Sequence, residues 1–286
     1  MARAIRKLQE RQHPNCRAAA CTTGRVTTSG IPSARRKLER AKFHADGLRA
    51  EIDAFREHSP HQFETKSLGN PRGQSDFRVI LKVIQAPTIP HDWAVVTGDI
   101  LTNVRAALDH AVFPHVRAHA PEVRPWKIQH PIEDTRGKFE AKTAGWSSEN
   151  VRKVIDEAQP YQFDDPSGHP LRILRELVNI DKHRDLVVST YAMDAFEVAL
   201  DDLYEVASPT QVYKREMVPG AVVARAHLRL VKKVHGDHLM QFPCNLVYGE
   251  TIDIPGIEGP AGLLRAIECV TAMIGPYLDA LEAAGC

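Results

Sequence analysis

The sequence predicts an α+β fold in which a helical bundle packs on an antiparallel β-sheet. Long segments whose apolar residues follow a helical period open, centre and close the chain. Short runs rich in Val, Ile, Tyr and Phe lie between them, separated by turn-forming residues. Helices and strands segregated in this way are typical of α+β proteins.

The chain has 286 residues, 43% of them hydrophobic and 26% charged, which excludes collagen-like, disulfide-scaffold and wholly disordered classes. No apolar run approaches the about 18 residues that a membrane-spanning helix requires, so we expect no membrane contact. Residues 1–32 have no sustained period and are expected to form a flexible basic arm. Residues 33–286 are expected to form a single α+β domain with a β-rich segment at 186–254.

The first long helix is expected to begin at Ser33, a favourable N-cap residue, and to end near Pro60. Two strands, 63–68 and 77–84, follow around a Gly- and Pro-containing turn at 69–73. A second long helix over 91–113 is expected to end at Pro114, because proline interrupts helices. The helical apolar stripe of the first segment consists of Leu38, Ala41, Ala45, Leu48, Ile52 and Phe55.

The second half of the chain is predicted to contain two short helices, four β-rich runs and a final helix that begins at Pro260. His235, Gly236 and Asp237 are expected to form the turn of a hairpin between the last two runs. The helices are expected at 148–158 and 170–184, and the β-rich runs at 186–191, 196–206, 222–234 and 238–247.

Charge is distributed unevenly along the chain. The first 59 residues carry 13 Lys and Arg against 6 Asp and Glu, whereas the remainder carries 24 against 30. A basic segment on an acidic body is a common handle for nucleic acid, although a solvated helix and tail give the same count. The five cysteines are odd in number and scattered, which indicates a reducing compartment, and we expect a cytoplasmic location.

Several common catalytic motifs are absent from the sequence. It contains no Gly-rich phosphate loop, no G-x-S-x-G elbow, no H-E-x-x-H and no EF-hand loop. His115 and His119 are four residues apart but follow Pro114, which is expected to break the helix. We therefore expect neither a cofactor nor a metal site.

The helix over 91–113 carries a polar stripe opposite its apolar face. Projection at 100° per residue places Asp99, Asn103 and His110 on one line, with Arg105 and Asp109 beside it as an i,i+4 pair. The stripe could line a cleft or a partner interface. It could equally be a solvated surface held by the Arg105 and Asp109 pair.

Asp181 falls on the apolar side of the helix over 170–184, while His183 lies opposite. A carboxylate on such a face requires a cation or several donors, because leaving it unpaired costs several kcal/mol. Arg105, His110 and Lys182 are the candidate partners. Asp181 could cap the helix end, or Asp181 and His183 could serve a small-molecule enzyme in a pocket between bundle and sheet.

Two segments carry a resemblance to known proteins. The segment 98–110 fits the pattern G-D-x-x-x-N-x-R-x-A-L-D-H. It is followed later in the chain by Gln159, Pro160 and Tyr161, and then by D-K-H-R at 181–184. Together they resemble a family of uncharacterised bacterial proteins. Arg105 and His110 also resemble the R-x4-6-H motif of the HEPN superfamily, helical bundles that include metal-independent ribonucleases acting as dimers.

The HEPN resemblance implies that Arg105 binds phosphate and that His110 acts as base or acid in attack by the RNA 2′-hydroxyl. Asp99, Asn103, Asp109, Asp181 and His183 would then support this pair. Because Arg105 and His110 point about 140° apart on one helix, the resemblance also implies a homodimer, with RNA as partner. The alternative is a non-catalytic protein that forms oligomers or binds other proteins.

Overall fold

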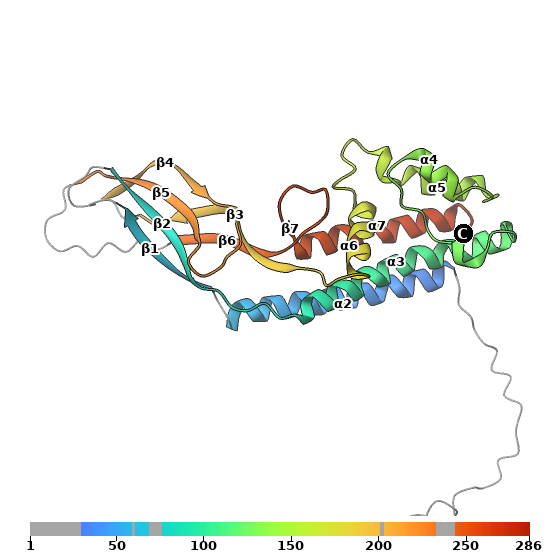
Figure 1. The fold of residues 1–286 in the computed structure, drawn as a ribbon, viewed down its shortest axis with the longest axis horizontal. Helices are drawn as coiled ribbons and strands as arrows, with labels where there is room; N and C mark the ends of the chain where they lie inside the picture. The colour runs from blue at the N-terminus through green and yellow to red at the C-terminus, as the bar shows by residue number, and fades with distance from the viewer. Residues whose placement is uncertain (1–29, 59–60, 69–75, 201–202, 233–243) are drawn as a thin grey trace, which may run out of the picture.

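The computed structural model describes residues 30–58, 61–68, 76–200, 203–232 and 244–286. Figure 1 shows an elongated molecule with the long helices at one end and the strands at the other. The predicted α+β class is confirmed, since helices and antiparallel strands are both extensive and largely segregated. The expected turns at 69–73 and 235–237, and all but the end of the expected arm, lie outside the described residues.

The bundle is built on α2 (Ile31–His58) and α3 (Asp92–His119), which pack along each other, with α6 (Pro170–Asp181) and α7 (Leu263–Ala283) against them. Each helix buries the apolar stripe expected from its sequence, which removes that surface from water. The buried side chains of the shared core include Leu48, Ile52, Trp93, Ile100, Leu108, Leu174, Leu177, Ile274 and Leu278.

Within the part of the chain that the structure describes, seven strands form two antiparallel sheets. Both sheets contribute to a second hydrophobic core that is separate from the bundle core and contains Phe77, Val79, Phe196 and Leu228. The four-stranded sheet has the order β1 (Gln62–Leu68), β2 (Asp76–Gln85), β5 (Val222–Leu230), β4 (Tyr204–Val212), and the three-stranded sheet has the order β3 (Val188–Val198), β6 (Cys244–Ile252), β7 (Ala261–Gly262).

Several of the expected helix boundaries are wrong, among them the start of α7, which begins at Leu263 and not at Pro260. The first helix begins at Ile31, so Ser33 lies inside it and its hydroxyl bonds His110 instead of capping. The second continues through Pro114 to His119, which places His115 and His119 on one helix with their rings stacked 4.3 Å apart. Pro114 has no amide hydrogen to donate to the carbonyl of His110, but the helix continues past this missing bond to His119. The third, α6, ends at Asp181, three residues early.

The strands at 63–68 and 77–84 are confirmed, but the later strand predictions need correction. The run at 186–191 lies mostly in β3, whereas the run at 196–206 covers the end of β3 and the start of β4. The pairing of β3 with β6 shifts between Ala192 and Phe196. The expected hairpin between the last two runs is wrong, because β5 pairs with β2 and β4 whereas β6 pairs with β3 and β7. The structure also forms α4 (Arg136–Lys142), a helix that is not among those expected from the sequence, beside α5 (Glu149–Glu157).

A charged contact joins the bundle to the sheets. Arg56, near the end of α2, forms an ion pair with Glu250 of β6, whose side chain is 3% exposed. Tyr248, two residues earlier, packs edge-on against His61. Among the described residues, no helix is long and apolar enough to cross a bilayer.

Candidate functional site

The two signature segments meet in the structure. Gly98 of α3 lies directly against the carboxylate of Asp181 at the end of α6, so closely that a Cβ at position 98 would lie 2.2 Å from Asp181 Oδ1. The absence of a side chain at Gly98 therefore leaves room for the carboxyl group of Asp181 against α3.

The expected cation partner of Asp181 is not found. Within the described residues its carboxylate forms no ion pair or hydrogen bond, and Arg105, His110 and Lys182 all point elsewhere. Burial raises the pKa of Asp181, and the nearby Asp99 and Asp185 raise it further. The expectation failed because Asp181 is only half-buried, so water solvates the carboxylate that the apolar arc was expected to enclose.

Arg105 and Asp109 bind the backbone of His130 between them. Arg105 Nη2 lies 3.1 Å from Asp109 Oδ1 and donates a hydrogen bond of 2.7 Å to the carbonyl of His130. Asp109 accepts a hydrogen bond of 2.8 Å from the His130 amide. The i,i+4 pair is therefore mostly shielded from solvent, and it anchors an irregular segment to the bundle. Burial raises the pKa of Asp109, and the charge of Arg105 opposes that shift.

Two further side chains hold the next residues of that segment. Gln159 accepts a hydrogen bond from the amide of Glu133 at 2.8 Å and donates one to the carbonyl of Pro131 at 3.0 Å. Arg175 of α6 donates to the carbonyl of Ile132 at 3.1 Å. Side chains thus satisfy backbone groups that a sheet would otherwise pair, as buried chain requires. These bonds hold residues 130–133 against the helices, and we call this segment the wall.

The ring of His130 lies inside the bundle. Its Nε2 and the hydroxyl of Tyr277 are hydrogen-bonded at 2.6 Å, and its Nδ1 is buried with no partner among the described residues. Burial, together with the charge of Arg105, lowers the pKa of His130 to about 3. The ring is therefore neutral over the physiological pH range and serves the core.

The polar stripe of α3 faces α2. His110 Nδ1 lies 2.9 Å from the hydroxyl of Ser33, and Asn103 Oδ1 accepts a hydrogen bond of 3.3 Å from Lys37. Asn103 also donates to the carbonyl of Asp99, one turn earlier on α3. The basic first helix therefore lies beside this stripe. Arg105 and His110 engage different neighbours, and one subunit does not bring them together.

A cavity of about 190 Å³, which we call the bundle pocket, opens where α3, α6, the end of α4 and the wall at 130–133 meet. Asp109 is the only carboxylate among its lining residues within the described chain. Three basic side chains converge on it from three helices, and a fourth, Lys182, comes from the turn that follows α6. The lining consists of Arg105, Asp109, Gln129, His130, Ile132, Lys142, Arg175, Val178, Asn179 and Lys182.

Carboxylates outside the lining hold two of these cations in place. Lys142 Nζ lies 2.7 Å from Glu133, and Arg175 contacts Asp134 at 2.8 Å. The exposed ammonium of Lys182 has no carboxylate partner among the described residues. The pocket therefore combines fixed cations with one uncompensated charge, which is how proteins hold an anion.

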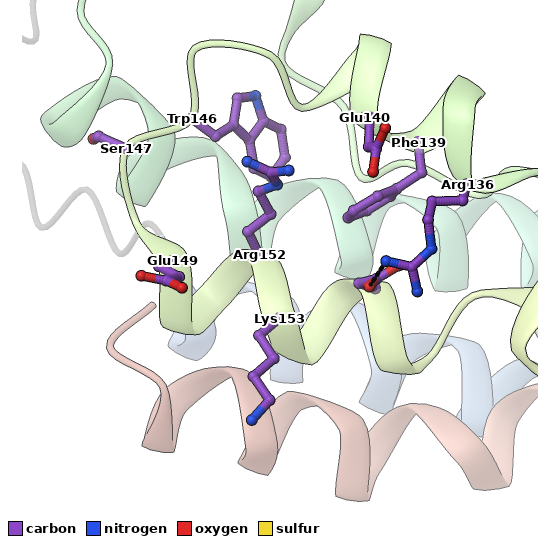
Figure 2. Close-up of a pocket in the computed structure, with 9 residues that line it drawn as sticks. Arg136, Phe139, Glu140, Trp146, Ser147, Glu149, Arg152 and Lys153 are labelled. Atoms are coloured by element: carbon purple, nitrogen blue, oxygen red, sulfur yellow. Dashed lines mark ion pairs between the residues drawn. The ribbon is translucent and has the colours of Figure 1, made fainter.

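Figure 2 shows a larger cavity of about 390 Å³ between α4, α5 and the chain that joins them. Trp146 and Phe139 supply its apolar side chains, and both are largely buried. Arg136 lies 3.4 Å from Asp156 across it. Its lining contains as many acidic as basic residues, so its charges select no ionic class of ligand: Arg136, Arg152, Lys153, Glu140, Glu149 and Asp156.

Sequence reasoning found part of the bundle pocket. Arg105 and Asp109 were named as supporting or catalytic residues, and both line it, but Asp99, Asn103, His110, Asp181 and His183 do not. His183 is exposed in the turn that follows α6. The basic residues Lys142, Arg175 and Lys182 were missed as site residues. The D-K-H-R segment was a signal for Lys182, but no local pattern points to Lys142.

Comparison with known proteins identifies no relative: no family model, curated protein or solved structure matches the chain.

Proposed function

We propose that the protein binds RNA, with a phosphate group held in the bundle pocket. The observation that carries the proposal is the convergence of Arg105, Lys142, Arg175 and Lys182 on one cavity that contains a single carboxylate. Basic side chains contribute most of the affinity of nucleic-acid binding, through phosphate contacts. The basic first helix and the HEPN resemblance favour RNA over other phosphate compounds.

The donors expected to contact the phosphate are those without another partner. Lys182 has a free ammonium, and the side-chain amides of Gln129 and Asn179 make no hydrogen bond within the described residues. Arg105 uses Nη2 for His130 and Asp109, so its Nε and Nη1 hydrogens remain. An arginine held from behind by a carboxylate loses little conformational freedom when it binds an anion.

Catalysis by Arg105 and His110 stays a prediction that depends on two copies of the chain. The Arg105 guanidinium is bound beside His130, whereas the His110 ring is bound to Ser33 of α2. A 2′-hydroxyl attack would require His110 of one copy to approach Arg105 of another. RNA cleavage that His110→Ala abolishes without loss of the fold would support it, and equal cleavage by that variant would end it.

RNA binding is tested by fluorescence anisotropy with a labelled oligouridylate. Removing one charge-assisted contact in Lys182→Ala should weaken binding about tenfold and lower the slope of log affinity against log salt by about 0.7. Lys153→Ala is the matched control, since Lys153 is an exposed lysine on α5 that does not line the pocket. Equal affinities for the two variants would contradict the proposal.

One observation favours the non-catalytic alternative. Arg105 and Asp109 hold the backbone of His130, and Gln159 of the same signature holds the residues beside it. These contacts give the signature a structural role without any ligand. An oligomer or protein partner, detected by light scattering or co-purification, together with no oligouridylate binding, would support this alternative.

A further inference from the structure

A second cluster of basic side chains lies at the other end of the molecule, on the outer face of the four-stranded sheet. Arg78 of β2 is directly opposite His227 of β5, and Ser208 of β4 follows on the other side of His227. Arg225 lies two residues along β5, opposite Gln211. We call Arg78, Arg225 and His227 the sheet-face cluster.

These side chains surround a cavity of about 200 Å³ whose lining has no acidic residue among the described chain. Their neighbours in the sequence, including Phe77, Val79 and Ala226, point to the opposite face and are buried in the strand core. The alternation of side chains along β2 and β5 therefore turns the cluster outward. Ser208, Pro209 and Gln211 complete the lining.

The edge strand is irregular at this point. The pairing of β4 with β5 shifts twice, between Val206 and Ser208 and between Ser208 and Gln211. Pro209 lies within the second shift, where a strand can accept a residue without an amide hydrogen. Bulges of this kind re-aim side chains beside binding sites, and here Ser208 and Gln211 both line the cavity with the basic residues.

The charges of the cluster are uncompensated, in contrast to the neighbouring arginine. Arg229, on the same face of β5, is bound by Asp76 at 2.9 Å and by Glu205 at 3.2 Å. Arg78 and Arg225 have no carboxylate partner among the described residues. The Nε of Arg225 is buried without a hydrogen-bond partner there, although its guanidinium packs over Tyr213. A buried donor without an acceptor is costly, so an anion in the cavity would satisfy it.

We infer that the sheet-face cluster is a second phosphate-binding site and that it takes a phosphate of a single-stranded RNA. Arg78 and Arg225 lie diagonally across two strands, a spacing of about 7–8 Å that places both within reach of one tetrahedral anion. The hydroxyl of Ser208 and the amide of Gln211 can donate to the same oxygens. The choice of RNA as ligand rests on the proposed function, but the site itself does not depend on the bundle pocket, which lies among the helices at the opposite end (Figure 1).

The test is the affinity of a labelled oligouridylate about a dozen nucleotides long for the full chain. Arg225→Gln should weaken binding about tenfold and lower the salt slope by about 0.7, whereas Arg225→Lys should keep the slope. Arg229→Gln is the matched control, because carboxylates already hold that charge. Arg78→Gln, at an exposed position, repeats the test if Arg225→Gln fails to fold.

Equal affinities for the Arg225→Gln and Arg229→Gln variants would overturn the inference. Competition identifies the ligand: inorganic phosphate and unlabelled RNA should displace the probe, and stronger displacement by a polyglutamate peptide would overturn the assignment to phosphate. If Lys182→Ala weakens binding and Arg225→Gln does not, only this second site is contradicted. If Arg225→Gln weakens binding and Lys182→Ala does not, only the bundle pocket is contradicted.

Discussion

The contact between Gly98 and Asp181 can be tested by adding one methyl group. In Gly98→Ala the new Cβ would lie 2.2 Å from Oδ1, 2.7 Å from Cγ and 2.9 Å from Oδ2 of Asp181. All three distances are below van der Waals contact, so the carboxyl group of Asp181 must move away from α3. Overpacking of this kind costs about 1–3 kcal/mol.

The same substitution also has a stabilising effect, which raises the free energy of unfolding. Alanine is favoured over glycine inside a helix by about 1 kcal/mol, and Gly98 lies well inside α3. The steric term is the larger one, so we expect Gly98→Ala to lower the free energy of unfolding by about 1 kcal/mol. In a chain that already carries Asp181→Ala, the clash is gone and the same change should stabilise by about 1 kcal/mol.

The assay is urea denaturation of four proteins: the wild type, the two single variants and the double variant. The predicted coupling between positions 98 and 181 is about 2 kcal/mol, well above the additivity error of about 0.5 kcal/mol. Additive effects of Gly98→Ala and Asp181→Ala would refute the claim that this contact joins the two signatures. A loss in the double variant equal to that of Gly98→Ala would refute it too.

Three further predictions concern buried charges. The folded state keeps His130 neutral down to pH about 3, whereas the unfolded chain protonates it near pH 6.5. The free energy of unfolding should therefore fall as the pH drops from about 6.5 to about 3. In a pH series of urea titrations, His130→Asn should make this fall smaller. Arg56→Ala leaves Glu250 buried without its partner and should destabilise by about 3 kcal/mol, with partial recovery on adding Glu250→Gln. Arg105→Ala removes the carbonyl bond and leaves Asp109 unpaired, so thermal unfolding should show a loss of about 2–3 kcal/mol.

The helices were predictable because each carries its own apolar period. The stripe from Leu263 to Leu281 on α7 is buried as expected, and so are Leu171, Leu174 and Leu177 on α6. Strands β1 and β2 were predictable for a similar reason, since alternation of side chains is local. Their partners were not, because the pairing of β2 with β5 joins residues about 150 positions apart and no local pattern encodes it.

In the candidate site, too, local sequence patterns predicted some residues, whereas contacts between distant segments were missed. Arg105 and Asp109 were visible as a pair one helical turn apart, and Asp181 was visible as a carboxylate on an apolar arc. The backbone of His130, to which the pair binds, is in a segment without regular structure and gave no signal. The sheet-face cluster was also missed, because Arg78 and Arg225 belong to strands whose adjacency is set by the fold.

Hydrogen–deuterium exchange with and without oligouridylate tests the bundle pocket most directly. If a phosphate binds there, residues 128–133 and 175–182 should exchange more slowly in the presence of RNA, because the ligand fixes the wall and the end of α6. Lys182→Ala should remove this protection and Lys153→Ala should keep it. Unchanged exchange in both segments at saturating RNA would contradict the account.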